Sequence, residues 1–127
     1  MRDYWIYSEQ FEAKAIDPRD FKHIDHVGVA WVMLQKYDFL TACDVYSRTI
    51  HALASSVGAE TKFNVTITFA FLSIMAERLA ENVGKDFEEF LTQNRDLLDR
   101  SLLEKWYSKE DLLSERARTR FLMPKVA

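Results

Sequence analysis

The sequence contains few of the residues that interrupt regular secondary structure or cross-link a chain. Its 127 residues include three glycines, two prolines and one cysteine. So few glycines and prolines argue against a turn-rich all-β fold, which needs many tight corners. Cys43 alone can form neither an intrachain disulfide nor a multi-thiolate metal site. We therefore expect a helical protein in a reducing, cytoplasmic compartment.

The chain also lacks a long apolar run and a strong net charge. Its most apolar stretch, residues 65–75, is interrupted by three hydroxyl side chains. This stretch is much shorter than the roughly 20 residues that cross a membrane, and the first residues carry no apolar signal segment. The formal net charge of −3 gives no overall attraction to nucleic acid or to an anionic membrane. We predict neither kind of partner.

Apolar and aromatic residues are abundant, at 48% and 13% of the chain. At this length they are sufficient for a packed core and exclude a disordered chain. No internal repeat, low-complexity tract or linker divides the sequence. We predict a single all-α domain over residues 1–127, a compact bundle of about five to six helices. Residues 1–16 are interpreted as an N-terminal arm and residues 122–127 as an extended tail.

Helix-capping residues, together with proline and glycine, predict where the helices begin and end. Asp17-Pro18 joins a good N-cap to a residue tolerated at the first helical position, so a first helix is expected from there to about Tyr37. Asp38 opens a second helix, which Gly58 ends. Further helix starts are predicted at Thr61, Asp86, Asp99, Ser108 and Ser114.

The third helix has a competing interpretation. Residues 64–69, with the sequence NVTITF, alternate polar and apolar side chains and are rich in β-branched residues, which is typical of a strand. The apolar pattern nevertheless continues without a break into residues 76–80, which are strong helix formers. We therefore predict a central helix that is apolar on most faces and ends near Gly84, with the strand as the open alternative.

Residues 21–31, FKHIDHVGVAW, follow the pattern F-x-H-x-x-H-x-x-x-A-W. This motif, together with a [YF]-[HN]-x-T-x-T motif in residues 63–68, resembles the signature of a widespread bacterial family of small helical proteins of uncharacterised activity. The resemblance implies a helical fold and no particular reaction. Many members carry Tyr-His where this chain has Phe63-Asn64, so an amide replaces a third histidine here. Further matching segments are residues 94–99, 106–108 and 121–124.

The histidine pair is the strongest candidate for chemistry. His23 and His26 are three residues apart, so on a helix they point to the same side. Histidine can donate or accept a proton near neutral pH. Asn64 and Thr68 lie one turn apart on the apolar third helix. We predict a small-molecule site between helices one and three, with His23 and His26 catalytic and Asn64, Thr68 and Trp31 binding the ligand.

Structural roles for the same residues stay open. His23 would then pack in the core with one ring nitrogen bonded to a backbone carbonyl. Thr68 would bond the carbonyl oxygen of Asn64, which itself sits near a helix start. Zinc or iron needs three or four ligands, and the sequence supplies too few beside the pair. We predict no metal and leave the cofactor unknown.

The rival function is a non-catalytic interaction module, in the form of a homo-oligomer or a complex with another protein. In that hypothesis the aromatic side chains of Tyr4, Trp5 and Tyr7 dock on the partner. The two hypotheses differ in what the structure should contain. A ligand-binding protein holds a cavity with both imidazoles, whereas an interaction module fills that space and exposes a large apolar patch.

Overall fold

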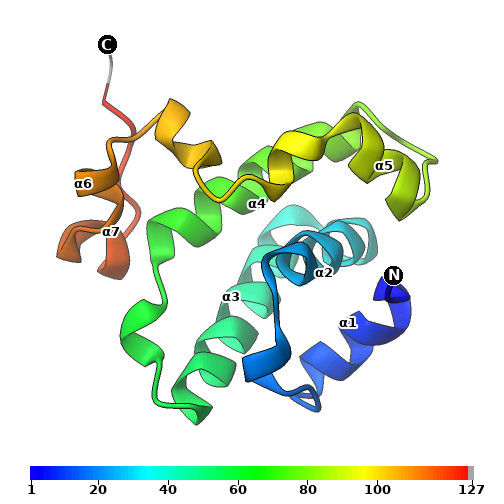
Figure 1. Ribbon diagram of the computed structural model, residues 1–127, viewed down its shortest axis with the longest axis horizontal. Coiled ribbons are helices and arrows are strands. Elements are labelled where there is room, and N and C mark those ends of the chain that lie inside the picture. Colours follow the sequence, from blue (N-terminus) through cyan, green and yellow to red (C-terminus); the bar gives the residue numbers. More distant parts are fainter. Residues whose placement is uncertain (126–127) are drawn as a thin grey trace.

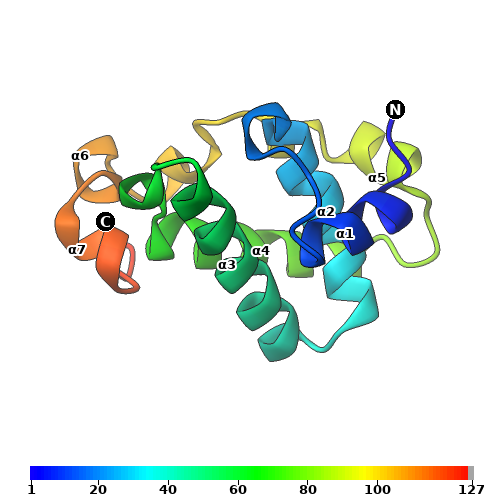
Figure 2. The ribbon, with the colours of Figure 1, turned by 90° about the horizontal axis from the view of Figure 1, so that it is seen from below.

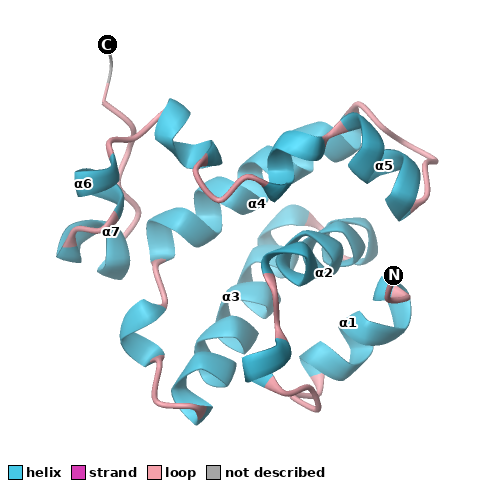
Figure 3. Ribbon diagram, viewed as in Figure 1, coloured by secondary structure: helices cyan, strands magenta, loops and turns pink. Residues whose placement is uncertain are grey.

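An apolar helix, α4 (Val65–Ala80), crosses the computed structural model, and the other long helices lie together on one side of it (Figure 1). The structure describes residues 1–125, which form helices and loops without any strand (Figure 3). The prediction of an all-α fold with a central apolar helix is confirmed. The strand alternative is wrong, because the side-chain oxygen of Asn64 accepts a hydrogen bond from the Ile67 amide at 2.9 Å and starts a helix there.

Residues 1–125 form seven α-helices, where about five to six were predicted. The difference arises at the two ends of the chain, since the N-terminal segment is helical and the C-terminal third is divided into short pieces. None of the helices in this part of the chain is both long and apolar enough to cross a membrane. Besides α4, the helices are α1 (Tyr4–Glu12), α2 (His23–Lys36), α3 (Phe39–Ser56), α5 (Phe87–Gln93), α6 (Lys109–Leu112) and α7 (Glu115–Thr119). Four 3-10 turns complete the fold: η1 (Pro18–Asp20), η2 (Glu60–Lys62), η3 (Arg95–Leu98) and η4 (Leu102–Lys105).

Helices α1, α2 and α3 lie together on one side of α4, whereas α6 and α7 lie beyond its N-terminal end (Figures 1 and 2). Helices α2 and α3 are joined by two residues, Tyr37 and Asp38, as expected for a helical hairpin. The main hydrophobic core is formed where α1, α2, α3 and α4 meet, and α5 closes it at one end. This arrangement leaves the side of α2 that carries the histidines facing α3 and α4.

The N-terminal segment is a helix rather than an irregular arm. The Asp3 carboxylate accepts hydrogen bonds from the amides of Trp5 and Ile6, at 3.0 and 3.3 Å, and so caps α1. Tyr4 and Tyr7 are buried within the chain itself, and Trp5 is 47% exposed. Two of the three aromatic side chains assigned to partner docking are therefore part of the protein's own core.

A buried carboxylate joins α1 to α2. Asp25, which is 1% exposed, accepts hydrogen bonds from Tyr4 Oη at 2.7 Å and from Arg2 Nε at 3.0 Å. Its second oxygen accepts the amide hydrogen of Lys22 at 2.9 Å, at the start of α2. Further along α2, a Cβ atom on Gly28 would overlap the Tyr4 ring, so glycine is needed for this close approach.

Several predicted helix starts are confirmed and others shift. Asp38, Asp86, Ser108 and Ser114 each accept an amide hydrogen bond as N-caps. Asp17 caps only the short turn η1, and α2 begins six residues later, at His23.

The other predicted starts differ for local reasons. Thr61 lies inside η2, and Asn64 takes the capping role because its side chain reaches the first turn of α4. Asp99 precedes a 3-10 turn, η4, rather than an α-helix. Of the predicted tail, residues 122–125 are non-helical, and residues 126–127 lie outside the described part of the chain.

Candidate ligand site

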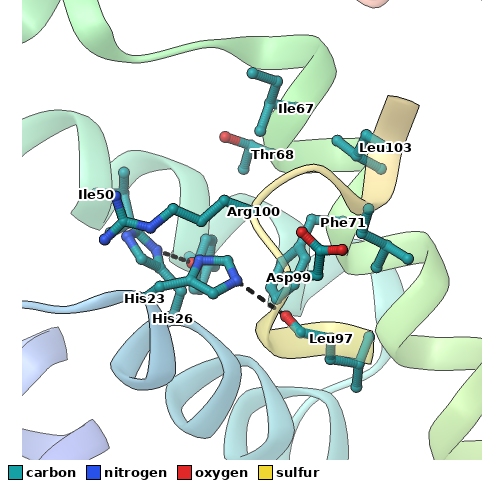
Figure 4. Close-up of a pocket in the computed structure, with 12 residues that line it drawn as sticks. His23, His26, Ile50, Ile67, Thr68, Phe71, Leu97, Asp99, Arg100 and Leu103 are labelled. Atoms are coloured by element: carbon teal, nitrogen blue, oxygen red, sulfur yellow. Dashed lines mark hydrogen bonds between the residues drawn. The ribbon is translucent and has the colours of Figure 1, made fainter. Parts of the chain in front are cut away.

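A cavity of about 160 Å³ lies between α2, α3 and α4, and residues 97–103 cover it (Figure 4). Its walls are predominantly aliphatic and aromatic. Both histidines of the pair and Thr68 line it, at the position predicted between the histidine helix and the central helix. The apolar walls are formed by Ile50, Ile67, Phe71, Leu97, Leu102 and Leu103.

His23 connects the first turn of α2 to the segment that covers the cavity. Its Nε2 lies 2.9 Å from the carbonyl oxygen of Leu97. A carbonyl oxygen can only accept, so Nε2 carries the hydrogen and the Nδ1 of the neutral ring keeps a free lone pair. The imidazole is thus bonded to a backbone carbonyl, as the structural interpretation expected, while it also lines the cavity.

His26 is paired with a buried tyrosine. Its Nδ1 lies 2.7 Å from Tyr46 Oη, and burial raises the pKa of Tyr46, so this hydroxyl keeps its proton. Within residues 1–125 the hydroxyl has no other partner, and a buried hydroxyl that cannot donate is costly. Tyr46 therefore donates to Nδ1, which assigns the ring hydrogen of neutral His26 to Nε2.

The surroundings of His26 oppose its protonation. Burial, and after it the nearby His23 ring, lowers the pKa of His26 to about 4; Asp25 acts in the opposite direction, and the Arg100 charge adds a smaller lowering effect. The ring centroids of the two histidines are 6.2 Å apart. At neutral pH, His26 is consequently an uncharged ring that offers one N–H group.

This pKa predicts a specific loss of stability in mild acid. An unfolded histidine titrates near pH 6.5, so between about pH 6.5 and 4 the unfolded chain binds the additional proton. Stability associated with neutral His26 is complete above this range and falls as the pH drops, by up to about 1.4 kcal/mol per pH unit. Urea unfolding at pH 7 and pH 5 should show a smaller loss for His26→Gln than for the parent protein. Equal losses would contradict the assignment.

Of the three residues predicted to bind the ligand, only one lines the cavity. Thr68 lines the cavity, and its hydroxyl donates to the carbonyl oxygen of Asn64 at 2.8 Å. Asn64 itself lies outside the lining: besides capping α4, its amide nitrogen donates to the Leu112 carbonyl oxygen at 2.7 Å. Trp31 is also outside, with its ring centroid 5.4 Å from that of Phe87 in the core. The cavity therefore contains the histidines and Thr68 without Asn64 or Trp31.

Three polar residues that line the cavity were not predicted from the sequence. Tyr46 lies on the apolar stripe of α3, where a core role was the natural interpretation. Asp99 and Arg100 come from the loop between η3 and η4, and no periodic pattern connects that loop with the histidines. Arg100 is exposed and forms no salt bridge with any residue of the described chain.

A bidentate ion pair holds the covering segment in place. Arg78, near the end of α4, donates to both carboxylate oxygens of Asp96 at 2.8 and 2.7 Å. It also donates to Asn94 Oδ1 at 3.0 Å. The neighbouring residue Glu77 is exposed, so of these two adjacent side chains only Arg78 reaches the covering segment. Residues 94–98 are thereby fixed against α4, and the Leu97 carbonyl is presented to His23.

Metal binding and nucleophilic chemistry find little support elsewhere in the described chain. Across residues 1–125, no group of three or more histidine, cysteine or acidic side chains is arranged to hold a metal ion. Cys43 is buried, and this burial raises the pKa of its thiol to about 11. A thiol in that state is a poor nucleophile at neutral pH.

Comparison with known proteins found no family model, curated protein or solved structure that matches the chain. The resemblance based on the histidine motif stays a prediction.

Proposed function

We propose that this protein binds a small, largely apolar molecule in the cavity between α2, α3 and α4. The observation that supports the proposal is a cavity of about 160 Å³ between the side chains, which both imidazoles line. A cavity of about 150 Å³ in another protein is large enough for benzene, so the guest is the size of a single ring or a branched aliphatic group. Apolar walls with a few converging polar groups are the usual form of a small-ligand site.

The polar groups of the cavity have distinct roles in this proposal. The Nδ1 lone pair of His23 accepts a hydrogen bond from the guest, because Nε2 is already committed to Leu97. The Nε2–H group of His26 donates, because Nδ1 is committed to Tyr46. One acceptor and one donor on adjacent rings can orient a guest that carries a matching donor, a matching acceptor or both. Proton transfer to the guest by His23 stays a prediction, as does a homo-oligomer.

The test is a ligand titration in which nuclear magnetic resonance monitors the signals of labelled isoleucine and leucine methyl groups. Single-ring compounds should shift the methyl signals of Ile50, Ile67 and Leu103, which line the cavity. Ile50→Phe places a ring in the cavity and so excludes part of the guest. The Kd of any such compound should rise by about tenfold or more, because a loss of about 1.4 kcal/mol of binding free energy is sufficient for this change.

Ile24→Phe is the matched control. Ile24 is also a partly buried helical isoleucine, but it does not line the cavity. This substitution should leave the Kd unchanged. Binding that survives Ile50→Phe unaltered, or a complete set of single-ring compounds that leaves the three methyl signals in place, would refute the proposed function.

A further inference from the structure

We infer that the guest of this cavity carries a carboxylate, which Arg100 and His26 bind at one end while the apolar walls enclose the rest of the molecule. The inference rests on the proposed function and specifies its ligand class: a monocarboxylate with a single-ring or branched aliphatic body.

The first observation is the position of Arg100. Its side chain extends from the loop between η3 and η4 across the histidine pair, and its guanidinium group lies toward His26 and Ile50 (Figure 4). Its positive charge is among the causes that lower the pKa of His26, which agrees with this proximity. Within the described chain Arg100 has no carboxylate partner, whereas Arg78 is fully engaged with Asp96.

The second observation is a hydrogen-bond donor beside this charge. Nδ1 of His26 is occupied by Tyr46, and no acceptor among residues 1–125 takes the hydrogen on Nε2. An N–H group and a guanidinium group close together, with no acceptor between them, form a site for an anion. Arginine matches a carboxylate especially well, because its planar group donates two parallel hydrogen bonds.

The acidic residue of the cavity does not neutralise this end. Asp99 lies on the other side of the cavity from the Arg100 guanidinium, beside Phe71 (Figure 4). Its carboxylate accepts hydrogen bonds from the backbone amide and hydroxyl of Ser101, at 2.9 and 2.7 Å. These bonds hold the pKa of Asp99 below its ordinary value and fix the charge on its own loop. The cavity is therefore polarised, with the Arg100 charge at the His26 end and the Asp99 charge nearer His23 and Phe71.

Three compounds with the same ring test the inference: benzoate, benzamide and benzylamine, which are anionic, neutral and cationic at pH 7. Each is titrated while the methyl signals of Ile50 and Ile67 are followed. Benzoate should bind about fivefold more tightly than benzamide, the effect of one exposed ion pair, and benzylamine more weakly than either. Added salt should weaken the binding of benzoate and leave that of benzamide unchanged.

Arg100→Gln should remove the preference for benzoate, because it keeps a polar hydrogen-bond donor, on a shorter side chain, without the charge. Arg95→Gln is the matched control, since Arg95 is an exposed arginine of the same segment that does not line the cavity. It should leave the preference intact.

The outcomes separate the inference from the function on which it rests. Equal Kd values for benzoate and benzamide, with both shifting the cavity methyl signals, would overturn the carboxylate inference and leave the proposed function standing. A benzoate preference that survives Arg100→Gln would overturn the role of Arg100. Failure of all three compounds to shift these signals, with shifts confined to methyl groups elsewhere, would overturn both.

Discussion

Replacing Asp25 with alanine is expected to lower the free energy of unfolding by about 3 kcal/mol. The carboxylate is almost completely buried and accepts hydrogen bonds from Tyr4, Arg2 and the Lys22 amide. Its removal leaves the buried Tyr4 hydroxyl without an acceptor and the N-terminus of α2 without its cap. Equilibrium unfolding in urea measures the loss directly.

Two further variants identify the source of this loss. Tyr4→Phe should cost about 1 kcal/mol in the parent protein and almost nothing when Asp25 is already alanine, because the two groups share one hydrogen bond. Asp20→Ala removes an exposed carboxylate that also contacts Arg2, and should change stability by less than about 0.5 kcal/mol. Additive effects of the Asp25 and Tyr4 substitutions would contradict the buried network.

This network also explains why the N-terminal segment was misinterpreted. A capping aspartate was available at residue 3, and Tyr4, Tyr7 and Phe11 follow it at helical spacing, but the apolar Trp5 and Ile6 lie off that face and obscure the pattern. The segment is stabilised as a helix by contacts with α2: the Tyr4–Asp25 hydrogen bond and the close approach of the Tyr4 ring to Gly28. Such contacts join residues more than 20 positions apart, so local patterns do not reveal them.

Helix starts were predictable where one side chain decides them. Asp38, Asp86, Ser108 and Ser114 cap helices in the structure as their spacing indicated, because an N-cap bond joins residues only two or three positions apart. Asp17-Pro18 has the same local signal, yet it forms only a 3-10 turn. The chain leaves this turn at Phe21, whose backbone is extended, and α2 begins after Lys22, whose amide donates to Asp25.

The candidate site was predictable to the extent that helix geometry determines it. A separation of three residues places His23 and His26 on one side of α2, and both line the cavity. Trp31 follows His26 by five residues, which turns it about 140° around the helix and into the core. Asn64 was assigned to the ligand although its amide is fully used by the start of α4 and by Leu112.

The covering segment was beyond prediction because a distant ion pair positions it. Arg78 and Asp96 are 18 residues apart, and no repeat or motif connects them. Their bidentate contact fixes η3 against α4, and η3 in turn offers the Leu97 carbonyl to His23. The loop that carries Arg100 follows directly. The geometry of the cavity therefore depends on a salt bridge whose two residues do not line the cavity.

Arg78→Met is accordingly expected to affect both stability and binding. The substitution keeps an unbranched apolar stem in place of the arginine methylene groups but removes three hydrogen bonds to Asp96 and Asn94. Because the pair is only partly buried, the loss of unfolding free energy should be about 2 kcal/mol, below that of a fully buried pair. Amide hydrogen exchange should accelerate most in residues 95–103.

The same variant should weaken binding of single-ring compounds more than its stability loss alone requires, since the covering segment closes one side of the cavity. Arg95→Met, at an exposed arginine without a salt bridge in the described chain, provides the comparison and should change neither property. Uniform acceleration of hydrogen exchange along the whole chain, with unchanged Kd in the folded variant, would show that the ion pair stabilises the fold without shaping the cavity. Local acceleration in residues 95–103 together with a raised Kd would instead establish that a contact outside the cavity keeps Arg100 and the Leu97 carbonyl at the positions the histidines require.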